Sequence, residues 1–264
     1  MTRVPILMYH SVTERPNPET RPLAVRTSVF AEQMSLLRDR GFSPLSLGGL
    51  TEAFHSGTVP GKPIVVTFDD GYADFHSDAL PVLERHGIPA TVFVTSGWLA
   101  DAGRHAAGRP LDTMLSWSQV REAVSCGVEI GGHSHSHPQL DQLPDRDLAG
   151  ELRTNKALLE DETGRPVVTM AYPYGYSSAR VRREVARAGY STACAVANAL
   201  TSAVHDRLAL PRLTVAANTT MGKFLRAVEG SGIPLIYLKE RALTKGYAVV
   251  RRTRYGWHKA RGRV

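Results

Sequence analysis

Residues 64–71 read IVVTFDDG, an apolar run that ends in two acidic residues and a glycine. A short apolar run rich in Val and Ile predicts a buried β-strand. Similar runs recur along the chain and alternate with helical patterns, which is typical of α/β proteins with parallel strands. We predict seven strands, at residues 4–9, 64–68, 90–94, 128–130, 167–171, 192–196 and 208–213.

Five helices are predicted between these strands. Each begins at a Ser or Asp and ends beside a Gly, residue types that favour the first and last positions of helices. Ser28, for example, is expected to cap the first of them. Their ranges are 28–40, 74–86, 116–127, 145–163 and 178–189. The alternation favours a (β/α) barrel, with an open doubly wound sheet as the alternative.

Length and composition are consistent with a single catalytic domain. The chain has 264 residues, of which 42% are hydrophobic, enough to bury one large core. Cys126 and Cys194 lie far apart in apolar or small-residue surroundings, so we expect buried free thiols, as in a reducing compartment. The sequence shows neither a long apolar span nor a signal-peptide pattern. We therefore expect a cytoplasmic protein.

The net charge of +7 is concentrated near the end of the chain. Residues 239–264 contain nine Lys or Arg and one acidic residue, Glu240, whereas the remainder is nearly neutral. We divide the chain into a catalytic domain, residues 1–234, and a basic tail, residues 235–264. We expect the tail to be a solvated, partly disordered terminus, and contact of its basic residues with an anionic membrane or polymer is the alternative. No nucleic-acid-binding signature is present, so nucleic acid is not an expected partner.

Chemistry is expected where strands end, because ligands of both candidate architectures bind at the carboxyl ends of the strands. Asp69 and Asp70 directly follow one strand, before Gly71. A metal on one carboxylate would keep it ionised and leave the other free to accept a proton. An ordinary Asp-Asp-Gly turn is the alternative interpretation.

A second motif, GGHSHSHP, occupies residues 131–138 after another strand. Three histidines within five residues indicate a metal site, and two imidazoles with one carboxylate leave positions open for catalysis. A metallo-β-lactamase-like or amidohydrolase-like site is a rival, but such sites have further ligands after the cluster. The only later candidate, His205-Asp206, is predicted to lie in a surface turn.

A third motif, AYPYG at residues 171–175, follows the run VVTMA. A turn at this place could direct a backbone N–H toward a developing oxyanion and form an aromatic wall for a sugar ring. Taken alone, it is an ordinary turn.

Together and in this order, TFDDG, HSHSHP and AYPYG resemble the polysaccharide deacetylases of carbohydrate esterase family 4, also called the NodB homology domain. The resemblance covers residues 5–213. It implies a distorted (β/α)7 barrel, a divalent metal and hydrolysis of N-acetyl groups on the amino sugars of a polysaccharide or glycoconjugate. Zn²⁺ is the default metal, with Co²⁺, Ni²⁺ or Mn²⁺ as alternatives.

The resemblance also assigns roles to individual residues. Asp69 matches the general base, and Asp70, His133 and His137 match the metal ligands. His135 falls on the variable position between the two histidines.

The substrate side of the site departs from the family pattern. Pro173 and Tyr174 match its substrate-binding pair, with the Tyr174 N–H expected to face the oxyanion. Ala171 stands where the family has an arginine. Another residue must therefore orient Asp69, and Arg212 at the end of the last strand is the expected substitute, so we count it with this group.

The proton donor is also displaced along the chain. The family's late Leu-x-His motif is replaced by Leu208-Ala209-Leu210, whereas an early strand ends in Met8-Tyr9-His10. This opening resembles the circularly permuted members that deacetylate poly-N-acetylglucosamine, in which the equivalent histidine comes first. We therefore predict His10 as the general acid. A polar residue that merely caps the strand is the alternative.

Two other functions remain open at this stage. One is a metal-dependent amide hydrolase acting on a small-molecule, nucleotide-linked or lipid-linked sugar, which the missing signal peptide favours. The other is an inactive carbohydrate-binding relative, which the missing arginine would allow. The sequence does not choose the sugar, the native metal or the oligomeric state.

Overall fold

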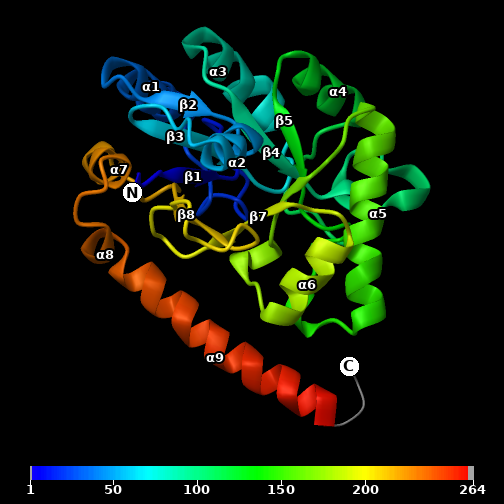
Figure 1. Cartoon of the computed structure of the whole chain (residues 1–264). Helices are drawn as coiled ribbons and strands as arrows, with labels where there is room; N and C mark the ends of the chain where they lie inside the picture. The colour runs from blue at the N-terminus through cyan, green and yellow to red at the C-terminus, as the bar shows by residue number, and fades with distance from the viewer. Residues whose placement is uncertain (1, 261–264) are drawn as a thin grey trace.

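The computed structural model describes residues 2–260 and contains one sheet of parallel strands (Figure 1). The strand order is β1-β8-β7-β6-β5-β4-β3-β2, and β1 also pairs with β3, which closes seven strands into a barrel. The prediction of a distorted (β/α)7 barrel in a single domain is therefore confirmed. The alternative, an open doubly wound sheet, was wrong. The strands are β1 Ile6–Tyr9, β2 Ser43–Leu45, β3 Pro63–Phe68, β4 Ala90–Val94, β5 Glu129–Gly132, β6 Thr169–Ala171, β7 Thr192–Val196 and β8 Leu210–Thr214.

Helices surround this barrel, and every helix predicted from the sequence is found among them (Figure 1). Their bounds are α1 Thr27–Asp39, α2 Leu47–Ser56, α3 Leu80–His86, α4 Trp117–Ser125, α5 Asp145–Thr163, α6 Ala179–Arg187, α7 Met221–Val228, α8 Ile233–Ile236 and α9 Leu238–Ala260. A π-helical turn, Phe75–Ala79, precedes α3. None of the described helices is long and apolar enough to cross a membrane.

Capping explains where several helices begin. Ser116 forms a capping box with Gln119 at the start of α4, and the Ser178 side chain accepts from the backbone of Val181 in α6. Ser28, in contrast, does not cap α1, because the helix begins one residue earlier and Arg26 occupies the N-cap position. The backbone N–H of Ser28 instead donates to the carboxylate of Glu14.

The sequence did not predict β2 and α2, which close the amino-terminal end of the barrel. A proline in the three-residue strand and two glycines in the helix obscure their patterns. Leu47 and Leu50 of α2 pack in one buried cluster with Val65 and Phe93 of the barrel interior. With this end filled, the carboxyl ends of the strands form the accessible end of the barrel.

Alternation along β3 decides which side chains enter the barrel. Val66 and Phe68 belong to the core between the sheet and the helices, whereas Val65 belongs to the interior cluster. Side chains two residues apart share a face, so Thr67 and then Asp69 follow Val65 into the interior.

Two expectations for other parts of the chain need correction. Cys194 is buried as predicted, but Cys126 is exposed because it lies at the carboxyl end of α4, beyond the core. In the basic tail, residues 238–260 form a helix, and residues 261–264 lie outside the described residues. The proposed division after residue 234 falls within α8.

Candidate active site

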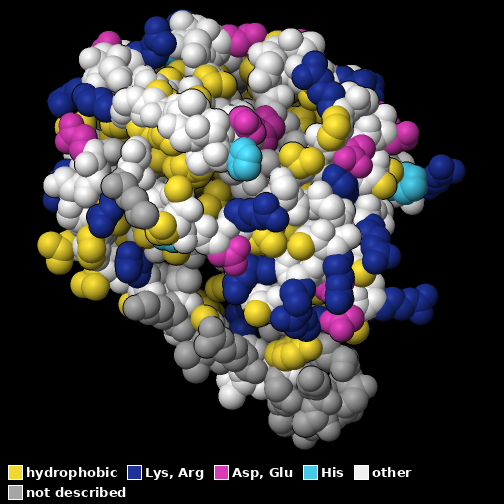
Figure 2. All heavy atoms as spheres, in the orientation of Figure 1, with side chains coloured by type: hydrophobic (Ala, Val, Ile, Leu, Met, Phe, Trp, Pro, Cys, Tyr) yellow, Lys and Arg dark blue, Asp and Glu magenta, His cyan; other side chains and the backbone are white. Residues whose placement is uncertain are grey.

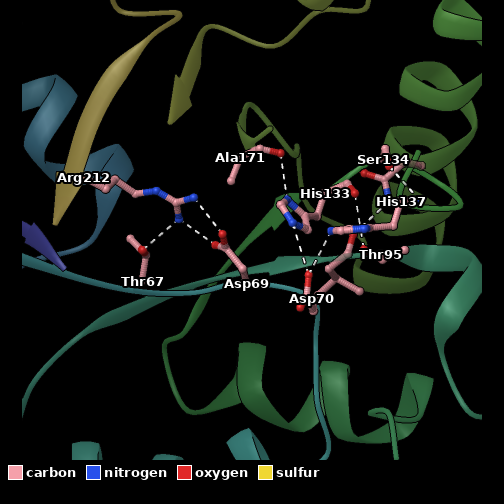
Figure 3. Close-up of polar contacts among 11 residues, drawn as sticks. Thr67, Asp69, Asp70, Thr95, His133, Ser134, His137, Ala171 and Arg212 are labelled. Carbon is pink, nitrogen blue, oxygen red and sulfur yellow. Dashed lines mark hydrogen bonds and ion pairs between the residues drawn. The ribbon is translucent and has the colours of Figure 1, made fainter. Parts of the chain in front are cut away.

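The carboxyl ends of β3 and β5 bring Asp70, His133 and His137 together (Figure 3). One ligand atom from each lies within 4.8 Å of the others. The Nε2 atoms of His133 and His137 lie 3.3 and 3.2 Å from the same carboxylate oxygen of Asp70. The three residues predicted as ligands thus converge on one point.

The loop backbones are folded tightly to achieve this convergence. Asp70, Ser134 and His137 all have positive φ angles, of 75°, 63° and 60°. Such angles are uncommon outside glycine and concentrate at functional sites. The Ser134 hydroxyl accepts from the backbone N–H of His137 at 3.0 Å, which holds the second histidine in place.

The hydrogen bonding of His133 shows that the group suits a cation. Its Nδ1 lies 2.8 Å from the carbonyl oxygen of Ala171, which can only accept, so Nδ1 carries the hydrogen. In a neutral ring, Nε2 then directs a lone pair toward the Asp70 carboxylate. Two electron-pair donors facing each other in a buried site require a positive charge between them, so this set fits a divalent metal.

The electrostatics of the cluster point the same way. Burial raises the pKa of Asp70, but the adjacent imidazoles of His133 and His137 outweigh it and hold the pKa well below its usual value. Burial lowers the pKa of His133, and the Asp69 and Asp70 carboxylates more than reverse this. The site therefore keeps its carboxylate ionised and attracts positive charge.

Asp69 is held in a different way, by Arg212 of β8 (Figure 3). The guanidinium makes two parallel hydrogen bonds to the carboxylate, of 2.6 and 2.7 Å, and a third of 3.1 Å to the Thr67 hydroxyl. Burial raises the pKa of Asp69, but Arg212 outweighs it and lowers the pKa below its usual value. Asp69 is therefore an ionised carboxylate fixed beside the cluster.

One cavity of about 350 Å³ contains most of the predicted site residues. Its volume lies within the range of small-molecule sites. Larger hollows occur elsewhere on the surface, but among the described residues this is the one that holds a group able to bind a metal. The predicted residues that line it are His10, Asp69, Asp70, His133, His137 and Tyr174.

Pro173 and Arg212, which were grouped with the substrate-binding residues, do not line this cavity. Pro173 is buried, and the Arg212 side chain is 0% exposed behind Asp69. Neither is placed to touch a substrate directly. Arg212 instead makes the contact with Asp69 expected of a substitute for the missing family arginine.

His10 enters the site because β1 pairs with β3. Tyr9 is in register with Phe68, and the Asp69 backbone N–H donates to the Tyr9 carbonyl at 3.0 Å. His10 and Asp69 therefore follow adjacent strands at the same height. Burial lowers the pKa of His10, although Asp70 and Asp69 act to raise it.

Aromatic rings flank His137 on two sides. The centroid of its ring lies 4.6 Å from that of Trp98 and 4.8 Å from that of Tyr174. The Tyr174 side chain is 53% exposed and stands at the cavity wall. The sequence motifs pointed to Tyr174 but missed Trp98, because a tryptophan in a loop carries no local signal of its partner.

The central histidine of the motif is turned away from the cluster. His135 Nδ1 lies 3.0 Å from the Ser96 hydroxyl, and Glu151 of α5 accepts from the backbone N–H groups of His135 and Ser136. His205-Asp206 lies in a turn outside the cavity, as expected. Among the described residues, the cluster thus has no later ligand of the kind that the rival metal sites would need.

Comparison with known proteins agrees with this arrangement. A model of the polysaccharide deacetylase family matches residues 56–193, more than half of the chain. YxkH, a Bacillus subtilis protein whose name assigns it to the polysaccharide deacetylases, is 25% identical over 228 residues, which cover 86% of this chain and 76% of YxkH.

The name of a second relative states an activity. The poly-β-1,6-N-acetyl-D-glucosamine N-deacetylase of Escherichia coli K12 is 34% identical over 139 residues. The matched region covers 50% of this chain but only 20% of the length of that enzyme.

A solved structure extends the likeness to most of the chain. The Streptococcus pyogenes deacetylase PplD, in complex with acetate, matches with a TM-score of 0.77 and 25% identity, over 86% of this chain and 98% of that one. The chain therefore belongs to the polysaccharide deacetylase family and is a hydrolase of carbon–nitrogen bonds other than peptide bonds.

Proposed function

We propose that this protein is a metal-dependent N-deacetylase of amino sugars in a carbohydrate. The observation that carries the proposal is the cavity in which a fixed carboxylate, Asp69, adjoins the three converging groups of Asp70, His133 and His137. The named activity of the Escherichia coli relative supports an N-acetylated sugar as substrate.

Asp70, His133 and His137 would hold the metal, with Zn²⁺ as the first choice for a site of two imidazoles and one carboxylate. When bound, the metal supplies Lewis acidity that activates water and polarises the acetyl carbonyl. Ala171 supports this site indirectly. Its carbonyl accepts from His133 Nδ1 and so fixes the tautomer and the ring orientation of His133.

Asp69 would act as the general base. Arg212 occupies one lone pair on each carboxylate oxygen, and a second lone pair on each remains available to accept a proton from water. The low pKa of Asp69 keeps its carboxylate ionised, the form that can accept a proton. The bidentate contact also fixes the direction in which the free lone pairs point.

His10 would donate a proton to the departing amine from its position beside Asp69 in the cavity. The lowered pKa of its imidazole makes the protonated ring a stronger acid, which favours this transfer. Tyr174 would form a wall for the sugar ring, and its backbone N–H would face the oxyanion.

Arg109 favours a second candidate, a sugar that carries a phosphate through a nucleotide or lipid. Its side chain lines the cavity, is 84% exposed and has only a loose partner in Glu19, at 3.7 Å. A guanidinium in this position could bind a phosphate of the substrate.

Acetate release tests both candidates. The zinc-reconstituted protein would be incubated with N-acetylated oligosaccharides, sugar nucleotides and lipid-linked N-acetylated sugars. We expect release from at least one class, and loss of both zinc and activity in His133→Ala. His135→Ala, in the same loop but turned away from the cluster, is the matched control and should retain zinc.

Asp69→Asn separates catalysis from metal binding. It should retain zinc and lose about 10²- to 10⁴-fold in rate, the usual contribution of a general base. Zinc binding without acetate release from any class would contradict the deacetylase proposal, and near-normal turnover of Asp69→Asn would contradict the assigned base.

A further inference from the structure

Hydrophobic side chains are exposed on the last two helices in an unusual concentration. Five of the eight large hydrophobic residues that are exposed among the described residues lie between residues 235 and 250, with exposures of 51% to 80%. Figure 2 shows hydrophobic side chains projecting over α8, and Lys and Arg side chains gathered over α6, beside α9. These five residues are Leu235, Leu238, Leu243, Tyr247 and Val250.

On α9 these side chains form one stripe. Leu243, Tyr247 and Val250 are spaced by four and then three residues, so they lie on the same face of the helix. Exposed basic residues extend the stripe at both ends, because Lys239 lies four residues before Leu243 and Arg254 lies four residues after Val250. We call the set on α9 the outward stripe; it consists of Lys239, Leu243, Tyr247, Val250 and Arg254.

The opposite face of α9 is occupied by the barrel, which fixes the orientation of the stripe. Arg251 is buried, pairs with Asp141 and stacks on the Tyr176 ring at 3.5 Å. Arg241 donates to the carbonyl of Asn198, which follows β7. The helix therefore cannot roll to bury its stripe without breaking these contacts.

The anchoring contacts also place α9 beside the active-site loops. Asp141 follows the loop that carries His137, and Tyr176 lies two residues after Tyr174 of the cavity wall. The helix that carries the outward stripe therefore packs beside the loops of the active site.

Charge indicates what covers the stripe. The segment from residue 239 onward has nine basic residues and one acidic residue, Glu240, whose carboxylate is paired with Lys223 at 3.0 Å. An apolar stripe between basic residues matches the surface of an anionic bilayer, where side chains such as Leu and Val enter the acyl boundary and Lys and Arg meet the headgroups. Self-association would instead bring like charges together.

We propose that the outward stripe of α9 docks the protein on the surface of an anionic lipid bilayer. The helix lies in the plane of the interface, and the active site is held next to the membrane. This surface is separate from the catalytic cavity, so the proposal does not depend on the proposed activity.

Vesicle sedimentation with the full-length protein tests this docking. We expect binding to vesicles of phosphatidylglycerol and phosphatidylcholine, weak binding to phosphatidylcholine alone, and loss of binding as salt rises. The variant Leu243→Glu/Val250→Glu should not bind. Val168→Glu, at a residue that is 41% exposed just before β6, at the end of the barrel opposite the active site, is the matched control and should bind normally.

A second pair of variants tests the charges. Lys239→Gln/Arg254→Gln should bind about 30-fold more weakly, since each basic residue near an anionic surface contributes a factor of about five. Arg38→Gln/Arg85→Gln, two exposed positions on α1 and α3, is the control for loss of charge alone. Circular dichroism would verify that every variant is folded.

The outcomes separate this proposal from its rivals and from the deacetylase proposal. Equal vesicle binding by the wild type and by Leu243→Glu/Val250→Glu would overturn it, as would the absence of binding. A dimer in analytical ultracentrifugation that this variant abolishes, without vesicle binding, would overturn it in favour of self-association. His133→Ala should bind vesicles normally, because docking requires no turnover.

Discussion

At the scale of single residues, the contact between Asp69 and Arg212 decides most about the site. Both side chains are buried, and two hydrogen bonds join Arg212 of β8 to Asp69 at the end of β3. A buried ion pair adds little net stability, but removal of one partner leaves an uncompensated charge. The pair is therefore sensitive to single substitutions.

Arg212→Met should destabilise the protein by about 3–5 kcal/mol, because it leaves the Asp69 carboxylate buried without its partner. The double variant Asp69→Asn/Arg212→Met should recover part of this loss. Urea denaturation of the wild type, the two single variants and the double variant measures the coupling between the residues. If the loss of stability in the double variant equals the sum of the losses in the two single variants, the two residues are not coupled.

A second buried carboxyl, Asp74, predicts how stability depends on pH. Burial raises its pKa from 3.8 to about 6, although the Ser11 hydroxyl donates to it at 2.5 Å. Between these two values the folded state binds more protons than the unfolded state, so Asp74 lowers stability as pH rises through this window.

Asp74→Asn cannot ionise, so it removes this penalty. The stability of the variant relative to the wild type should rise by up to about 3 kcal/mol between about pH 4 and about pH 7. Urea denaturation of both proteins across this range measures the difference. A difference that does not change with pH would contradict the raised pKa.

At the scale of elements, β5 presents the histidine loop because its two glycines admit close neighbours. A Cβ on Gly132 would lie 2.3 Å from the Tyr190 hydroxyl and 2.5 Å from the Asn155 side-chain oxygen. Asn155 of α5 in turn donates to the Val94 carbonyl at 2.9 Å. The missing side chain therefore allows α5 to pack against β5 directly below His133.

Gly132→Ala should destabilise the protein by about 1–3 kcal/mol, because an added methyl group overpacks this contact. It should also weaken zinc binding, since His133 is the next residue. Gly150→Ala, at a position of α5 with open space around it, is the matched control and should stabilise slightly. Thermal unfolding and zinc titration measure both effects, and equal behaviour of the two variants would contradict the packing argument.

At the scale of the whole molecule, closure of the barrel assembles the site from distant segments. The pairing of β1 with β3 brings His10 beside Asp69, and β8 delivers Arg212 on the other side of β1. The proposed metal ligands come from two loops separated by more than 60 residues. A metal would therefore link parts of the chain that are far apart in sequence.

Metal binding should stabilise the whole barrel. Zinc at 100 times its dissociation constant should add about 2.7 kcal/mol, because only the folded state holds the three ligands together. This corresponds to a rise in Tm of about 5–10 °C for a domain of this size. Differential scanning calorimetry with zinc and with a chelator measures the shift, and the same rise in His133→Ala would place the zinc elsewhere.

The sequence by itself determined seven of the eight described strands, five of the nine described helices and the motif residues that gather in the cavity. These features are local, because a strand, a cap or a cluster such as HSHSHP is written in a few consecutive residues. The order of the motifs along the chain then identified the family, and the barrel followed from it. The short β2 and the glycine-containing α2 carry too weak a local pattern to be predicted.

Only the tertiary structure decided which residues face one another. The two hydrogen bonds between Arg212 and Asp69, the ring of Trp98 against His137 and the exposed stripe of α9 all depend on distances between segments far apart in the chain. A sequence motif records which side chains are present, whereas barrel closure and helix packing set their distances and exposure. Those distances determine the charge, the orientation and the accessibility on which the proposed chemistry depends.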